Sequence, residues 1–505
     1  MDPEPRRIET SVDGSSGVQI GTGNIQNNNY VAPEPLDLSF VEWSSPRAAA
    51  DKILGMPARN AFRVLAEAAV DKTAAVLRVL LASDDSLVVE LLADVHPGRV
   101  QALVDAGGAE LEVLRDVPRA DEEISELHGH HRAVLGGKHG GLRRSAASPR
   151  GNTGFYRLYE NGAIFWSASA GAVSLLGPFL RFHRDEGGTG GRLGFPIGES
   201  EGVTGTGVAT KALRQRLEPD KHSRATSVYS TVEYGVFATR GGIGKHYDLR
   251  GGPDRFGFPT GPGVEAGPTR SGGTGDSGWI QPFEKGSIAY TNSTGAIEIM
   301  SPVREHHDAH GGVSGRLGFP RGKAQGAGRS PRGTDGKFQR FEGAWDYPED
   351  LVAACIGFDR PGGATVYTSV HGTYKVDGGI GILYERMGGT AGWLGFPTGS
   401  SEKAEERRRV QAFEGGDIYW SPEHDAVAVR ADVLALVRFV PPTGFRFDPD
   451  ERVGFPTHPE QSIGSGPDTI QFFEHAVVTR RSNDLTVWHP RSEAQPPAPS
   501  TGRTY

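Results

Sequence analysis

The chain has 505 residues, 36% of them hydrophobic and 23% charged, a composition typical of a soluble protein with roughly two or three domains. The net charge of −8 offers no basic surface for nucleic acid, and the single cysteine excludes an internal disulfide framework and a thiolate metal cluster. No stretch approaches the roughly 18 apolar residues that are needed to span a bilayer. The 72 glycines favour turn-rich β structure.

The first 44 residues predict a disordered arm. They lack the apolar core of a secretory signal, so we expect a cytoplasmic protein, with delivery to the cell wall by a non-classical route as the alternative. Within the arm, residues 17–30 alternate β-branched and amide side chains and contain neither charge nor proline. Such a segment can stack in register, with ladders of amides along a fibre.

This segment resembles the amyloid signalling motifs of bacteria and the homotypic interaction motif of animal receptor-interacting kinases. The matching core is an aliphatic-Gln-aliphatic-Gly-x-x-Asn run that consists of Val18, Gln19, Ile20, Gly21 and Asn24. The resemblance implies assembly with a second copy of the chain or with a partner that carries a matching motif. The alternative is a flexible polar arm.

Residues 45–116 predict a small domain of four or five short helices, because their apolar residues recur at helical spacing. Ser45-Pro46 and His96-Pro97 are typical of helix starts. The position of this domain resembles that of the adaptor domains between signalling motifs and effectors.

Residues 117–152 are expected to form a solvated linker. They contain His128, His130, His131 and His139, but no carboxylate or cysteine stands at a fixed ligand spacing, so we predict no metal site. The same interpretation applies to the histidines of residues 306–310.

Residues 153–490 contain a five-residue unit that recurs five times, with successive glycines 63, 61, 77 and 59 residues apart. Glycine permits a positive φ, proline fixes its own φ, and the phenylalanine between them can bury a large ring. The unit therefore predicts a tight turn pinned into a core. The turn residues are Gly194, Phe195, Pro196, Gly257, Phe258, Pro259, Gly318, Phe319, Pro320, Gly395, Phe396, Pro397, Gly454, Phe455 and Pro456.

A second unit alternates with the turns and predicts β-hairpins, for example over residues 281–290 and 411–420. A glutamate recurs at one hairpin position, and we expect it to accept backbone N–H groups of the adjoining turn. The six copies are Glu160, Glu218, Glu284, Glu342, Glu414 and Glu474. Because a catalytic site is normally unique, and no Ser-His-Asp elbow, phosphate loop or HExxH motif is present, we predict no catalytic residues, no cofactor and no enzyme activity.

Together the two units resemble the LGFP repeats of actinobacterial cell-envelope proteins. The resemblance implies attachment to the arabinogalactan-peptidoglycan layer of the wall. A hairpin at each end of the series would leave open strand edges, so we expect a mainly β fold in which five units close into a propeller-like ring. The proline-rich tail, residues 491–505, is expected to be disordered.

Five aromatic residues near the turns are candidates for stacking on sugar rings, with core packing as the alternative. They are Trp166, Tyr290, Trp345, Trp393 and Trp420. We therefore expect a non-enzymatic protein that recognises cell-wall glycan (arabinogalactan or peptidoglycan) or a related polymer, coupled to homotypic assembly through the amino-terminal motif. An exported wall-anchoring protein without a signalling role and a hydrolase acting through the repeats are the alternatives.

Overall fold

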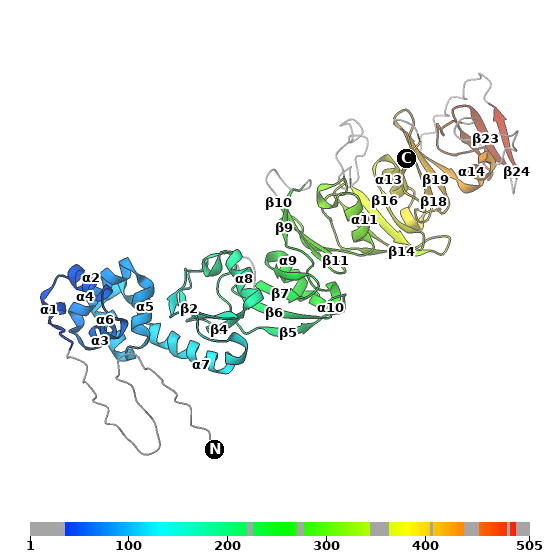
Figure 1. The fold of residues 1–505 in the computed structure, drawn as a ribbon. Coiled ribbons are helices and arrows are strands. Elements are labelled where there is room, and N and C mark those ends of the chain that lie inside the picture. The colour runs from blue at the N-terminus through cyan, green and yellow to red at the C-terminus, as the bar shows by residue number, and fades with distance from the viewer. Residues whose placement is uncertain are drawn as a thin grey trace, which may run out of the picture. The chain divides into compact units, whose positions relative to one another are not determined.

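The computed structural model describes residues 36–219, 226–269, 277–343, 363–404, 408–438, 454–481 and 485–490. Two compact units are found, one within Met1–Glu122 and Gly141–Arg144 and the other within Glu123–Gly140 and Ser145–Tyr505. The prediction of a mainly β chain with a helical region near its amino terminus is confirmed (Figure 1). The amyloid-type motif, Trp345 and the tail lie outside the described residues.

The helical unit is built from short helices, three of which, α2, α5 and α6, have a side-chain cap at their start. Ser45 accepts a hydrogen bond from the Ala48 N–H, and His96 accepts one from the Gly98 N–H, so both helix starts predicted from the sequence are present. Apolar side chains such as Leu77 are fully buried between the helices. The elements are α1 (Ser39–Trp43), α2 (Pro46–Leu54), α3 (Ala58–Glu67), α4 (Val70–Ser83), α5 (Asp85–Ala93), α6 (Pro97–Gly107), η1 (Gly108–Glu110) and η2 (Glu112–Leu114). The next helix, α7 (Val117–Leu135), begins before the boundary at Glu122 and belongs for most of its length to the other unit.

The described strands form six antiparallel four-stranded sheets, numbered 1 to 6 in chain order (Figure 1). Sheets 1 to 3 contain β1 (Arg143–Arg144), β2 (Gly154–Tyr159), β3 (Gly162–Ser167), β4 (Gly171–Leu176), β5 (Glu201–Thr204), β6 (Lys211–Leu217), β7 (Thr226–Thr231), β8 (Gly235–Thr239), β9 (Val264–Pro268), β10 (Ser277–Phe283), β11 (Gly286–Thr291) and β12 (Gly295–Met300).

Sheets 4 to 6 contain β13 (Gln325–Arg329), β14 (Asp335–Phe341), β15 (Ala364–Ser369), β16 (Gly372–Val376), β17 (Glu402–Lys403), β18 (Arg409–Phe413), β19 (Gly416–Ser421), β20 (Asp425–Arg430), β21 (Gln461–Ser462), β22 (Thr469–Phe472), β23 (Ala476–Arg481) and β24 (Leu485–Pro490). The predicted hairpins at 281–290 and 411–420 are β10–β11 and β18–β19.

A helix follows the fourth strand of each of sheets 1 to 5, and the glycine-rich turn follows the helix. These elements are α8 (Gly177–Asp185) with η3 (Gly188–Gly190), α9 (Gly241–Leu249) with α10 (Gly252–Phe256), α11 (Val303–Ala309) with η4 (Gly312–Ser314), α13 (Gly378–Arg386) with η5 (Gly389–Ala391), and α14 (Ala431–Arg438).

The expected closed five-unit ring is not supported. The strand that ends at Tyr159 pairs within sheet 1, and the strand that precedes Phe473 pairs within sheet 6, so the described strands do not form a shared closing blade. The physical reason is that each turn is followed by a short polar strand, such as β5 or β13, which pairs with its own hairpin. Each sheet is therefore complete by itself, and its short, exposed first strand makes a poor template for further pairing.

Candidate functional site

The second compact unit, within Glu123–Gly140 and Ser145–Tyr505, has one regular feature, the joint between consecutive sheets. We define a joint as the helix, the turn and the hairpin glutamate that link one sheet to the next. In every turn the glycine has a φ between +64° and +72°. The phenylalanine that follows is buried in all five turns, and the proline forms a β-bridge to the residue before the hairpin glutamate. Backbone contacts of the turn thus connect the helix to the sheet that follows it.

The turn phenylalanine also packs into the preceding sheet. A Cβ atom on Gly278 of β10 would overlap the ring of Phe319, and one on Gly336 of β14 would overlap the ring of Phe396. These glycines therefore leave the space that the ring fills. The core around Phe195 accordingly combines side chains from β3 and β7, which belong to sheets 1 and 2. The turn is a packing element, because its largest side chain fills a space between two sheets.

The hairpin glutamate holds the turn through its Oε2 atom. The N–H groups of the turn phenylalanines donate to this atom in four joints, at 2.8 Å for Glu284, 3.0 Å for Glu342 and 2.9 Å for both Glu414 and Glu474. In return, the glutamate N–H donates to the phenylalanine carbonyl in all four. The recurring carboxylate therefore accepts backbone N–H groups of the turn, as its position in the sequence predicts.

The other carboxylate oxygen binds a loop of the preceding sheet. Glu284 Oε1 accepts from the Ala209 N–H at 2.7 Å, and Glu474 Oε1 accepts from Arg408 at 2.8 Å. Glu414 Oε1 accepts from the Thr334 hydroxyl and lies 3.0 Å from His371 Nε2. Burial raises the pKa of Glu414, but the hydrogen bonds from Thr334 and from the Phe396 N–H outweigh this effect and lower the pKa to about 2. Glu414 therefore remains ionised in its joint.

A buried histidine or tyrosine on the helix binds the carbonyl oxygen of the turn glycine. The side-chain atom lies 2.8 Å from that oxygen for His183 and Tyr247, 3.0 Å for His307 and 2.6 Å for Tyr384. Sequence reasoning missed this position and assigned residues 306–310 to a solvated segment. The signal was present, because the aromatic residue precedes the glycine by 10 or 11 residues in each case.

A sixth, divergent joint precedes sheet 1. Gly136 has a φ of +78°, lies against Glu160, and offers its carbonyl oxygen to His128 Nε2 at 2.9 Å. Lys138 forms the β-bridge to Tyr159 where the other turns have proline. Residues 117–140, which the sequence suggested to be linker, therefore supply a helix and a turn. They were missed because Leu135-Gly136-Gly137-Lys138 lacks the Phe-Pro pair.

The aromatic candidates for sugar binding do not form a common surface. Trp166 is 1% exposed, and its Nε1–H donates to Glu123 at 2.7 Å, so it is a packing residue with no face for a sugar. Tyr290 and Trp420 lie against Gly242 and Gly379, the second residues of α9 and α13. Both side chains pack against the hydrophobic core. Packing, the alternative interpretation of the sequence, therefore describes Trp166, while Tyr290 and Trp420 are half-buried at the edge of the core.

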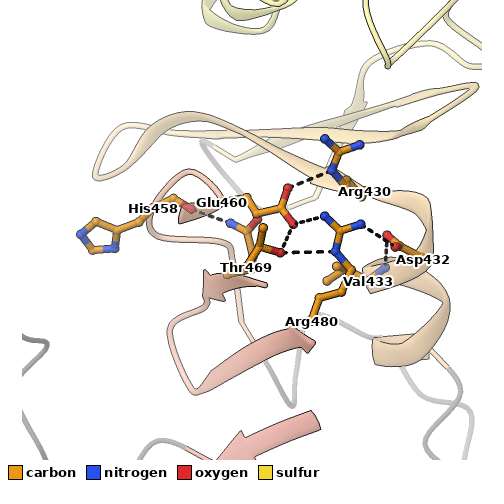
Figure 2. Close-up of polar contacts among 8 residues, drawn as sticks. Arg430, Asp432, Val433, His458, Glu460, Thr469 and Arg480 are labelled. Carbon is orange, nitrogen blue, oxygen red and sulfur yellow. Dashed lines mark hydrogen bonds and ion pairs between the residues drawn. The ribbon is translucent and has the colours of Figure 1, made fainter. Parts of the chain in front are cut away.

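Trp393 is also half-buried beside the core, but its position in the repeat differs from that of the other candidates. It stands at the turn position that is arginine in the other four copies, and its half-buried ring lies 4.4 Å from the guanidinium of Arg430. Arg430 Nε donates to Glu460 Oε2 at 2.8 Å, and Arg480 donates to Glu460 Oε1 at 3.1 Å (Figure 2). Arg480 also contacts Asp432 at 3.4 Å. The two arginines and two carboxylates form an electrically neutral cluster between sheets 5 and 6.

The cluster lowers the pKa of Glu460. Burial raises this pKa, while hydrogen bonds from Thr469 and Arg430 and the charges of Arg430 and Arg480 lower it by more. In the described residues no group of three His, Cys, Asp or Glu side chains is arranged to hold a metal ion. Within the same residues, no helix combines the length and apolar character required for a membrane span.

Comparison with known proteins locates one repeat. Residues 394–436 match the LGFP repeat family, a span that runs from the fourth turn through β18, β19 and β20 into α14. No curated protein matches the chain. The LGFP repeat suggests a cell-wall-associated repeat protein. The chain contains this repeat at residues 394–436, and the joint that it forms recurs, with the same bonds, in the sheets that precede and follow it.

Proposed function

We propose that the chain is a non-enzymatic binding protein whose repeats recognise cell-wall glycan, such as arabinogalactan or peptidoglycan, or a related polymer. The LGFP match at residues 394–436 carries this proposal. The repetition of the joint supports it, because tandem copies can add weak contacts to one polymer by multivalency. Both oxygens of Glu284 and Glu414 are engaged by turn and loop donors, which favours a structural role for these glutamates.

Trp393 and Arg430 are the residues that we propose as a sugar contact. A half-buried indole can stack on the apolar face of a sugar ring, and a guanidinium can donate to its hydroxyl or carboxylate groups. Arg430 binds Glu460 through its Nε. Figure 2 shows the two terminal nitrogens of Arg430 pointing away from Glu460.

Trp393→Ala should reduce the amount of protein that sediments with insoluble actinobacterial wall material by about tenfold, on the order of the energy of one stacking contact with a cation beside it. Trp43→Ala is the matched control, because Trp43 is 84% exposed in the helical unit and its loss should leave sedimentation unchanged. Melting curves of both variants show whether the fold is retained. Full retention of wall binding by a folded Trp393→Ala protein would exclude this contact.

The same wall material tests the absence of catalysis. We expect no release of reducing ends or soluble fragments during prolonged incubation. If fragments do appear and Glu284→Gln abolishes them in a folded protein, the hydrolase alternative replaces the binding function.

We also propose that residues 17–30 mediate homotypic assembly. A peptide of this segment should form thioflavin-positive fibres, and Gln19→Asp or Ile20→Asp should abolish them, because a stack repeats the same buried charge in every layer. Fibre formation is followed by fluorescence and electron microscopy. A wild-type peptide that stays monomeric at high concentration contradicts the assembly role and leaves the wall-anchoring alternative, which cell fractionation tests directly.

A further inference from the structure

The four joints between sheets 1 and 5 alternate in the chemistry of the helix side chain that binds the turn. His183 serves the joint between sheets 1 and 2 and His307 the joint between sheets 3 and 4. Tyr247 and Tyr384 serve the joints between sheets 2 and 3 and between sheets 4 and 5. Histidine gains a charge near pH 6.5, whereas tyrosine stays neutral throughout the acidic range.

The four side chains occupy equivalent places. His307 stacks on Phe341 of the following sheet, with the ring centroids 5.2 Å apart. In the same way Tyr247 stacks on Phe283 and Tyr384 on Phe413, each with a centroid distance of 4.7 Å. His183 lies edge-on to Phe165 of β3 at 5.3 Å, and Tyr247 and Tyr384 lie edge-on to tyrosines of the preceding sheets in the same way. A histidine-to-tyrosine exchange therefore reproduces an arrangement that the fold already contains.

Among the described residues, the elements packed most closely against α8 offer no acid to balance a positive charge on His183. These elements are β3, β4, β7, β8 and η3, and their sequences contain no charged residue. Their one titratable group is Tyr229, whose pKa burial raises above its ordinary value. On α8 itself the charge that acts on His183 is that of Arg184, which is also positive, and the helix further carries Arg181 and Asp185. His183 is 1% exposed, and its Nδ1 atom has no hydrogen-bond partner among the described residues.

His307 is equally buried but has mixed neighbours. On α11, Asp308 Oδ1 lies 3.8 Å from its Nδ1, and the helix also carries Arg304, Glu305 and His306. His310, directly after the helix, adds a Coulombic effect that lowers the pKa of His307. The elements packed against α11 carry Glu298 on β12, Tyr367 on β15, and Tyr374 and Lys375 on β16. Glu298 is already paired with His246 at 2.5 Å and with Arg255 at 2.8 Å. A charge on His307 would thus gain little new compensation beyond that from Asp308.

We propose that acid selectively opens the joints held by His183 and His307, while the joints held by Tyr247 and Tyr384 stay closed. A proton on either imidazole places a positive charge in a buried site, and for His183 it also creates an N–H donor without an acceptor. Opening the joint hydrates the imidazolium. Acid would then separate sheet 1 from sheet 2 and sheet 3 from sheet 4, and would leave sheets 2 and 3, and sheets 4 and 5, joined as pairs.

The direction of the effect follows from the two states of each histidine. Burial lowers the pKa of His183 and His307 below their ordinary value of 6.5, and the hydrogen bond to the turn carbonyl offsets this only in part. The open joint therefore takes up a proton near pH 6.5, and the closed joint does so only at lower pH. Each of these two joints has its full stability above pH 6.5 and loses stability as the pH decreases below that value. The equilibrium constant for opening a joint rises by up to about tenfold for each pH unit, because each joint contains one such histidine.

Limited proteolysis of the full chain, mapped by mass spectrometry, tests the proposal. A protease that is active at both pH 7.5 and pH 5.5 is used. For each turn, the cleavage rate at pH 5.5 is divided by the rate at pH 7.5. We expect the ratio to rise by about tenfold at residues 187–193 and 311–317, and to stay near one at residues 251–256 and 388–393.

Two exchanges provide matched controls. His183→Tyr with His307→Tyr should abolish the rise at the first and third turns, and Tyr384→His should create a rise at residues 388–393. Equal ratios at all four turns in the wild type, or a rise that persists in the tyrosine variant, would overturn the proposal. If the tyrosine variant does not fold, Tyr384→His decides alone, and the absence of a new acid-sensitive turn in that protein contradicts the inference.

Discussion

Replacing Phe396 by alanine should lower the free energy of unfolding of the repeat region by about 3 to 5 kcal/mol, the usual cost of truncating a fully buried phenylalanine. Phe396 is completely buried, and its ring occupies the space that Gly336 leaves in the preceding sheet. The backbone bond from Phe396 to Glu414 does not involve the ring and can persist. The change therefore removes packing on both sides of one joint. Denaturant unfolding followed by circular dichroism measures the loss.

Two further variants make this result interpretable. Phe396→Leu refills part of the space and should cost less than half as much. Val232→Ala, at a residue that is 98% exposed, should have an effect within about 0.5 kcal/mol. An unchanged unfolding midpoint for Phe396→Ala would mean that the turn is a surface feature, and the account of the joint as a packing element would then be wrong.

Gly257→Ala should destabilise the chain by about 3 to 5 kcal/mol, because two costs add at this position. Gly257 has a φ of +72°, which is unfavourable for a residue with a side chain. A Cβ atom there would also overlap the carboxylate of Glu284, which accepts the N–H groups of Phe258 and Ala209. Displacing that carboxylate leaves two backbone donors without their acceptor. Thermal and denaturant unfolding measure the total.

Gly295→Ala is the control that separates the two costs. Gly295 has a φ of +70°, but a Cβ atom there would have open space around it. Its substitution should therefore cost only the backbone term, about 1 to 2 kcal/mol. Equal losses for Gly257→Ala and Gly295→Ala would show that the contact with Glu284 contributes nothing to the stability of the turn.

The bonds within the joint limit which residues can contact a ligand. The repeated groups of the joint, the turn phenylalanine, the glutamate and the helix histidine or tyrosine, are engaged with one another, so they serve the fold. Under the proposed function, a polymer would contact residues outside this bonded set. Trp393 is one of them, at a position where the other four turns have arginine. The wall-binding test is directed at it for this reason.

The amino-acid sequence by itself determined the features that depend on neighbours along the chain. Gly-Phe-Pro specifies a turn through the φ of glycine and proline, and alternating apolar residues around a glycine specify a hairpin. The helical region before them follows from the spacing of its apolar residues and from caps such as Ser45. The role of Glu284 at the turn could also be predicted, because a carboxylate that recurs with every hairpin must serve something that also recurs.

Only the tertiary structure decided what depends on residues far apart in the sequence. Short polar strands such as β5 and β13 carry almost no hydrophobic signal, yet they complete each sheet and replace the expected ring by separate sheets. Trp166 could not be told from a sugar-binding residue until Glu123, 43 residues away, was seen to accept its N–H. Hydrophobic periodicity reports which face of an element is buried, but the partner that buries it is chosen by packing across the whole fold.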